Sequence, residues 1–164
     1  MIRNMKNSKR ARAAAIIVNN QNVLVIQRIS KGKEYYVFPG GGVEKGESLK
    51  QAVIREVREE TSLEVRIEKL LYHYYHPDRK EDQFFYLCRY LAGKPKLSDC
   101  EELEEMKNGA DNFYLPLWSK IVDLPQLLLY PLEVRDWFMK DIKREFKGVP
   151  KKMVVNFLEL RRKL

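Results

Sequence analysis

Apolar runs separated by polar breaks mark the N-terminal quarter of the chain. Residues 13–18 and 23–29 are apolar and rich in β-branched side chains, and the polar segment 19–22 lies between them. This pattern predicts a β-hairpin with a four-residue turn. Residues 35–38 predict a further short strand, because Pro39 and three glycines end the apolar run there.

The remaining elements alternate between strand and helix. Aromatic and β-branched positions predict strands at 65–76, 84–91 and 113–118. Helical periodicity predicts helices over 48–62 and 132–146, and a short basic element follows at 154–164. Interleaved strands and helices with no long linker predict one α/β domain with a mixed sheet. We expect a flexible basic lead-in over residues 1–10, the domain itself over residues 11–147 and a basic C-terminal extension over residues 148–164.

The predicted helix over residues 48–62 has a recognisable start and one buried stripe. Ser48 is a good N-cap, and Gln51 three residues later completes a capping box. On a helical wheel, four apolar side chains form the core stripe: Leu49, Ala52, Val53 and Val57. Lys50, Gln51, Arg55 and Arg58 form the solvent face, and Ile54 falls among them as an exception.

Carboxylates fall inside that apolar stripe. Glu56 and Glu60 lie within about 20° of Leu49, and Glu59 lies at the edge of the stripe. Inward carboxylates are costly unless they are paired or bind a metal ion, and a hard divalent cation such as Mg²⁺ would also relieve their mutual repulsion. The alternative is neutralisation by a cation that folds over the cluster, from Lys45, Arg55 or Arg58. The geometry favours the metal.

These residues belong to a recognisable signature. Residues 41–63 contain Gly41, Glu47, the run from Arg55 to Glu60, and Leu63 at the spacing of the Nudix box, which this segment resembles. The exception is Ser62, where the family usually has Gly. That position ends the helix, where a left-handed conformation favours Gly, so Ser is expected to cost about 1 kcal/mol without removing a ligand.

The resemblance to the Nudix (MutT-like) hydrolases implies a three-layer α/β/α sandwich with a mixed central sheet. It implies that Glu56, Glu59 and Glu60 hold Mg²⁺, or Mn²⁺ in its place, with a carbonyl of Gly40 or Gly41 as a further ligand. It also implies that Glu47 and Arg55 pair to orient the helix and that Arg28 contacts a substrate phosphate. The base that accepts a proton from water is left open: Glu56, Glu59, or one of Glu101, Glu102, Glu104 and Glu105 in the later acidic loop.

The substrate implied by the resemblance is a nucleoside diphosphate linked to another group. A nucleoside triphosphate or an oxidised purine nucleotide is favoured, ADP-ribose is next, and a dinucleoside polyphosphate or a capped RNA end is a further alternative. The rival outside the enzymes is a Nudix-fold nucleotide sensor or RNA-binding module. Several strand aromatics are able to stack a base, although such residues more often pack in a core: Tyr35, Tyr36, Phe38, Tyr74, Phe84 and Phe85.

Composition adds information about partners. The net charge is +8 over 164 residues, but residues 1–12 contribute +5 and residues 140–164 contribute +6, so the middle carries 8 − 11 = −3. Basic ends favour RNA as an additional partner, although solvated basic ends are the commoner case.

No apolar run is long enough to cross a membrane, and two cysteines, Cys88 and Cys100, indicate a reduced cytoplasmic protein. The leucine-rich stretch 121–132 is compatible with a homodimer.

Overall fold

The computed structural model describes residues 10–77, 79–98, 104, 106, 109 and 111–154. Its helices are α1 (Leu49–Thr61), the short 3₁₀ helix η1 (Ile121–Gln126) and α3 (Leu132–Ile142). The strands are β1 (Arg10–Asn19), β2 (Asn22–Ser30), β3 (Lys33–Val37), β4 (Gly40–Gly42), β5 (Glu64–His76), β6 (Glu81–Ala92), β7 (Asn112–Lys120), β8 (Leu129–Tyr130) and β9 (Lys151–Val154). Within these ranges, every helix is too short or too polar to cross a membrane.

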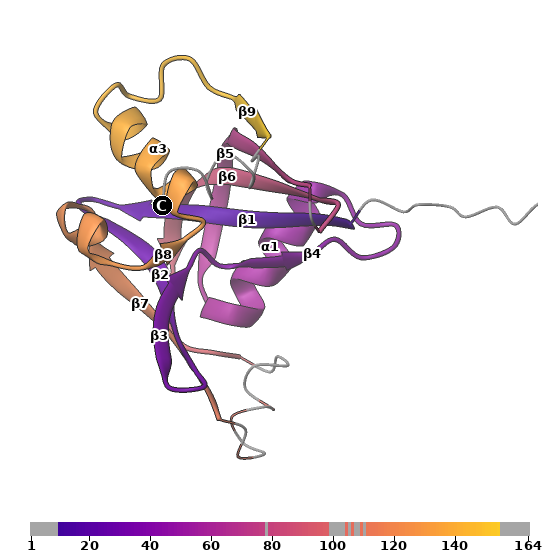
Figure 1. The fold of residues 1–164 in the computed structure, drawn as a ribbon, viewed down its shortest axis with the longest axis vertical. Helices are drawn as coiled ribbons and strands as arrows, with labels where there is room; N and C mark the ends of the chain where they lie inside the picture. Colours follow the sequence, from indigo (N-terminus) through magenta and orange to yellow (C-terminus); the bar gives the residue numbers. More distant parts are fainter. Residues whose placement is uncertain are drawn as a thin grey trace, which may run out of the picture.

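One mixed sheet joins the strands. Its main order is β8-β3-β2-β1-β6-β5-β9, while β4 pairs with β1 and β7 pairs with β2. The pairs β1·β6, β3·β8 and β5·β9 are parallel, and the other pairs are antiparallel. Helix α1 covers one face of the sheet and α3 covers the other (Figure 1). This arrangement confirms the predicted α/β/α sandwich.

Strand β1 shows how the sequence builds the two layers. Successive side chains of a strand point to opposite faces. Ala13, Ala15 and Ile17 pack in the core cluster that contains the apolar stripe of α1. Ile16, between them, packs in the other cluster, which contains Phe138 of α3. A strand buried on both faces reads as a continuous apolar run, which is why residues 13–18 carry no polar position.

Two predicted boundaries were wrong. Asn19 pairs with Asn22, so the β1–β2 connection is a two-residue turn instead of a four-residue one, and Asn20 adopts a left-handed φ of 53° within it. The C-terminal helix ends at Ile142 and does not continue to residue 146. Phe146 has a φ of 55° and its N–H returns to the carbonyl of Asp141, which turns its ring back onto Phe138.

Strand β9 belongs to the segment predicted as a basic extension. It pairs in parallel with residues 72–75 of β5, at the edge of the sheet. The fully buried Asp141 of α3 accepts a hydrogen bond from the Tyr72 hydroxyl at 2.9 Å and forms an ion pair with Lys151 of β9. A buried carboxylate needs such partners, so these contacts tie the C-terminal segment to the helix and the sheet.

Candidate functional site

The site begins where the chain crosses from β4 into α1. Strand β4 lies alongside β1, and the N–H of Val43 continues the pairing to the carbonyl of Ala11. Gly46 has a φ of 83°, which permits the tight turn before the helix. The expected capping box is present, since Gln51 N donates to Ser48 Oγ at 3.2 Å and Ser48 N donates to Gln51 Oε1 at 2.8 Å. The glycine strand is thereby fixed beside the helix.

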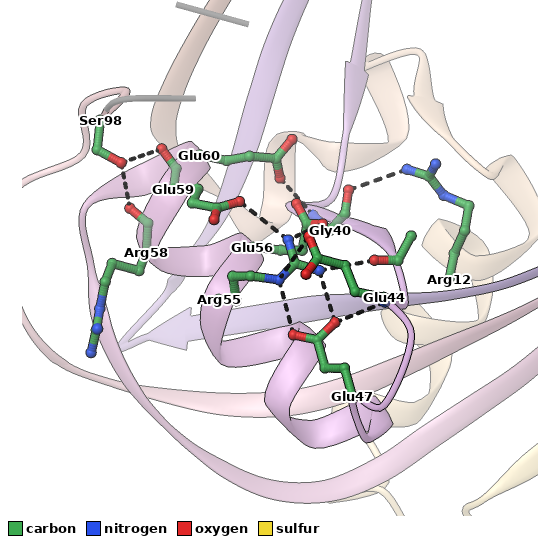
Figure 2. A network of polar contacts seen from close by, with 11 residues as sticks. Arg12, Gly40, Glu44, Glu47, Arg55, Glu56, Arg58, Glu59, Glu60 and Ser98 are labelled. Carbon is green, nitrogen blue, oxygen red and sulfur yellow. Dashed lines mark hydrogen bonds and ion pairs between the residues drawn. The ribbon is translucent and has the colours of Figure 1, made fainter. Parts of the chain in front are cut away.

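Arg55 is the centre of a charged network (Figure 2). Its Nε and Nη2 each donate to the Glu47 carboxylate at 2.9 Å, and Nη2 also donates to the carbonyl of Gly42 at 2.9 Å. Its Nη1 donates to Glu56 at 2.8 Å and to Glu59 at 3.2 Å. A planar guanidinium makes several such bonds at fixed angles. Arg55 therefore links the loop before the helix to two of its carboxylates.

The same contacts shift the acidity of the network. The hydrogen bonds from Arg55 and the backbone of Glu44 hold the pKa of Glu47 below its usual range. Burial raises the pKa of Glu56, and the hydrogen bond from Arg55 opposes this only in part. Glu47 is therefore a firmly ionised anchor, while Glu56 is a carboxylate that would gain from a further cation.

Glu56 depends on a glycine opposite it. A Cβ built at Gly41 would lie 2.2 Å from Glu56 Oε1 and 2.5 Å from its Cδ. The side chain of Glu56 is only 14% exposed. The carboxylate therefore occupies space that any other residue at position 41 would fill, which gives the glycine of the box a direct steric role.

Glu60 and Glu59 lie on either side of the boundary between buried and exposed. Glu60 is 7% exposed and accepts a hydrogen bond from the N–H of Gly40 at 2.7 Å. The side chain of Glu59 is 39% exposed. The wheel placed these three side chains correctly, since Glu56 and Glu60 turn inward and Glu59 lies at the rim. It was wrong for Arg55, which was predicted on the solvent face but is only 24% exposed and folds over the carboxylates, as in the alternative to a metal ion.

Arg28 lies on the same side of the sheet. It is on β2, where Leu24 packs in the cluster below α1, and even-numbered residues of this strand share that face. Its guanidinium lies over the ring of Tyr114, 4.4 Å from the centroid. Burial lowers the pKa of Arg28, but the Tyr114 hydroxyl and the charge of Glu60 outweigh it, so the pKa is raised overall. The structure thus brings Arg28 within electrostatic reach of the helix carboxylates.

The donor set fits a hard divalent cation, although the present contacts are internal. Three carboxylates project from one end of α1, and Mg²⁺ prefers carboxylate and carbonyl oxygens. Among the described residues no three acidic, histidine or cysteine side chains converge as a ready metal cluster. Instead Glu56 accepts a hydrogen bond from Arg55, and Glu60 accepts one from the N–H of Gly40. The carbonyl of Gly40 accepts a hydrogen bond from Arg12 at 3.2 Å. A bound cation would compete with these partners.

The acidic loop is tied to the same helix end. Ser98 donates through its N–H and its hydroxyl to the carbonyl of Glu59, at 2.9 Å and 2.6 Å. Of the four glutamates considered for this loop, Glu104 is exposed, and Glu101, Glu102 and Glu105 lie outside the described residues. Sequence reasoning missed Ser98, Arg12 and Tyr114, because none of them lies within the box or carries a pattern of its own.

Comparison with known proteins gives a family match and several relatives. The family model described as NUDIX domain matches residues 9–120. The chain is 42% identical over 65 residues to the ADP-ribose pyrophosphatase of Methanocaldococcus jannaschii, covering 39% of this chain and 38% of that protein. It is 36% identical over 90 residues to the 8-oxo-dGTP diphosphatase of Escherichia coli, covering 51% and 68%. The chain therefore spans well under half of the first relative and about two thirds of the second.

Solved structures share the architecture. A NUDIX hydrolase from Nitrosomonas europaea superposes with a TM-score of 0.69 at 18% identity, covering 90% of this chain and 79% of that one. An ADP-ribose pyrophosphatase from Streptococcus suis superposes with a TM-score of 0.62 at 17% identity, covering 90% and 100%. At this level of identity the likeness concerns the fold.

Proposed function

This chain belongs to the NUDIX family, and on that premise we propose that it hydrolyses the diphosphate linkage of a nucleoside diphosphate-linked substrate with Mg²⁺. A nucleoside triphosphate or an oxidised purine nucleotide is the favoured substrate, and ADP-ribose is next. The observation that carries the proposal is the carboxylate set at one end of α1. Glu56 and Glu60 turn inward and Glu59 stands at the rim, with Arg28 on the same face.

The proposed metal ligands are Glu56, Glu59 and Glu60, with a backbone carbonyl of Gly40 or Gly41 in addition. Mn²⁺ is the alternative ion. A bound divalent cation supplies neutralisation of phosphate charge and a lowered pKa of the attacking water. Burial raises the pKa of Glu56, which leaves that carboxylate with charge that a cation would stabilise.

The other residues orient and neutralise. Arg55 holds the Glu56 and Glu59 carboxylates on the side of the helix that faces β4, and Glu47 in turn fixes Arg55. Arg28 is the proposed phosphate contact, because its charge lies on the same face and within reach of Glu60. Glu59 is the better placed of the two helix candidates to accept a proton from water, since its side chain is 39% exposed and Glu56 is 14% exposed.

The proposal is tested by product release from a panel of substrates with and without Mg²⁺. The panel contains nucleoside triphosphates, an oxidised purine triphosphate, ADP-ribose and a dinucleoside polyphosphate. Glu59→Gln keeps the shape of a half-exposed side chain and removes its charge, so we expect turnover to fall about a hundredfold or more. Glu64→Gln, an exposed change at the start of β5, is the matched control and should leave turnover unchanged.

Three outcomes would count against the proposal. Turnover that is independent of Mg²⁺ would remove the metal from the chemistry, and turnover that survives Glu59→Gln would remove Glu59 from it. Absence of turnover with every compound, together with retained nucleotide binding, would favour the nucleotide-sensing or RNA-binding alternative. RNA binding by the basic ends should be tested by charge-neutralising substitutions, because deleting residues 147–164 would also remove strand β9 from the sheet.

A further inference from the structure

A row of side chains crosses three neighbouring strands on the face that α1 covers. Arg28 of β2 is the register partner of both Tyr35 on β3 and Tyr114 on β7. Directly paired residues project from the same face of a sheet. Since Arg28 shares its face with Leu24, which packs below α1, the whole row lies on that side.

Tyr130 extends the row onto a fourth strand. It lies on β8 and is the register partner of Val37, which shares its face with Tyr35 two residues earlier on β3. The rings of Tyr35 and Tyr130 meet edge to face, with centroids 6.1 Å apart and planes inclined at 70°. Tyr130 is 46% exposed and Tyr35 is half-buried. We call these two rings the tyrosine pair.

Arg28 connects the tyrosine pair to the carboxylates. Arg28 lies on β2, between β3, which carries Tyr35, and β1, beside which β4 binds Glu60 through the N–H of Gly40. The charge on Arg28 interacts with both Tyr35 and Glu60. Its guanidinium is held in place over the ring of Tyr114 at 4.4 Å. The order across this face is therefore an aromatic pair, a fixed cation and then the cluster of carboxylates. A nucleotide presents a matching order, with an aromatic base at one end and, at the other, the phosphate chain that contains the bond to be cleaved.

The other aromatic side chains suggested by the sequence make contacts elsewhere. Phe38, Tyr74 and Phe85 are buried in the core that α3 covers. Tyr36 donates its hydroxyl to Glu34 at 2.6 Å and projects to the opposite face from Tyr35. Phe84 stacks on His73 with ring centroids 4.4 Å apart. Of that set Tyr35 alone lies beside Arg28 with part of its ring exposed, and the structure adds Tyr130.

We propose that the tyrosine pair stacks the nucleobase of the substrate and thereby makes this chain selective for nucleotides over base-free polyphosphates. The inference rests on the proposed function and deepens it. Stacking on aromatic rings tolerates different bases, because every base has a π-face, so the pair would distinguish nucleotides from base-free phosphates more strongly than one base from another. The larger face of a purine would give it the advantage over a pyrimidine.

The test compares GTP with ribose 5-triphosphate, which carries the same phosphates and no base. Tyr130→Leu and Tyr35→Leu should each raise KM for GTP about tenfold, with kcat changed by less than about twofold, because a base-stacking ring is lost and the reacting groups are untouched. KM for ribose 5-triphosphate should not change. Tyr130→Phe keeps the ring and should restore the KM for GTP.

Tyr90→Leu is the matched control. Tyr90 forms a similar edge-to-face pair with Trp118, with centroids 5.5 Å apart, on strands β6 and β7. Its loss should leave both substrates unaffected. If the leucine variants leave KM for GTP unchanged, or raise KM for both substrates equally, the tyrosine pair does not bind the base.

A binding measurement separates this inference from the proposed function. Equilibrium binding of GDP in the presence of Mg²⁺ should weaken about tenfold in the same leucine variants, whether or not GTP is hydrolysed. Hydrolysis of GTP and of ribose 5-triphosphate with equal KM would leave the proposed function standing and refute the tyrosine pair. Absence of hydrolysis, together with GDP binding that depends on Tyr35 and Tyr130, would refute the proposed function and support the tyrosine pair.

Discussion

Three consecutive glycines offer a steric test of the carboxylate site. A Cβ at Gly41 would meet Glu56 Oε1 at 2.2 Å, far inside the 3.4 Å at which ordinary contact begins, and the backbone of Gly41 needs no left-handed φ. Gly41→Ala should therefore keep the backbone and displace one carboxylate. A Cβ at Gly42 would meet nothing within 4 Å, so Gly42→Ala is the matched control.

The expected magnitudes for Gly41→Ala follow from what the Glu56 carboxylate does. Its displacement breaks the 2.8 Å bond from Arg55 Nη1, and a hydrogen bond to a charged group contributes about 1.5–3 kcal/mol. Release of a buried carboxylate to water offsets that loss, so the free energy of unfolding should change by less than about 2 kcal/mol. Loss of a metal ligand should lower kcat about a hundredfold, which corresponds to about 2.7 kcal/mol of transition-state stabilisation.

Gly40→Ala should behave differently. The contacts of a Cβ there are backbone atoms of β1, with Ala13 O and Ala14 Cα both at 2.5 Å, and the φ of 154° is unfavourable for other residues. This variant should lose stability by several kcal/mol, about the scale of overpacking plus backbone strain.

The assay is Mg²⁺-dependent product release beside thermal unfolding for all three variants. Activity of Gly41→Ala within about twofold of the unmodified chain would show that the position of Glu56 is unimportant to catalysis.

Other predictions concern stability and pH. Ser62→Gly should raise the free energy of unfolding by about 1–2 kcal/mol, measured by denaturant titration, because Ser62 ends α1 at a φ of 55° with its hydroxyl buried and without a partner in the described part of the chain. Lys151→Met should destabilise the fold by about 2 kcal/mol because it strips the buried Asp141 of a partner, whereas the exposed neighbour Lys152→Met should have no effect in the same titration. Burial raises the pKa of Glu56 in the folded chain above 4.5, its ordinary value, which also applies to the unfolded chain. The folded chain therefore loses stability as the pH rises past the unfolded pKa, and the loss is complete above the folded pKa. Glu56→Gln should therefore raise the Tm of the metal-free chain at neutral pH, and a lower Tm would contradict the burial argument.

Local patterns carried the prediction of the helix and its charged face. The capping box of α1, its inward Glu56 and Glu60, and the left-handed end at Ser62 all follow from neighbours within a few residues on one helix. Such features depend on period and cap chemistry, which the sequence contains directly. The hairpin and the end of α3 were misjudged at their boundaries, where Asn20 and Phe146 take left-handed conformations. The ring of Phe146 packs on Phe138, a contact that the periodicity of the helix does not reveal.

Long-range contacts were beyond prediction from sequence. Tyr130 follows a proline- and leucine-rich stretch with no strand pattern, and only the pairing of β8 with β3 places it beside Tyr35. Strand β4 is made of three glycines, which read as a turn, and it is a strand because β1 lies alongside it. The partners of Asp141 come from 69 residues earlier and 10 residues later in the chain. No local rule joins segments at such separations.

Strand β9 also covers a part of the sheet that could otherwise pair with another molecule. Residues 72–75 of β5 are aromatic and lie at the end of the sheet, where open N–H and C=O groups would form a template for pairing between molecules. The backbone of β9 satisfies those groups within the same chain, and the Lys151–Asp141 ion pair holds that strand against the molecule. We therefore expect variants at Lys151 to detach β9 more readily and to leave this edge of β5 open, which would appear as turbidity in concentrated solution.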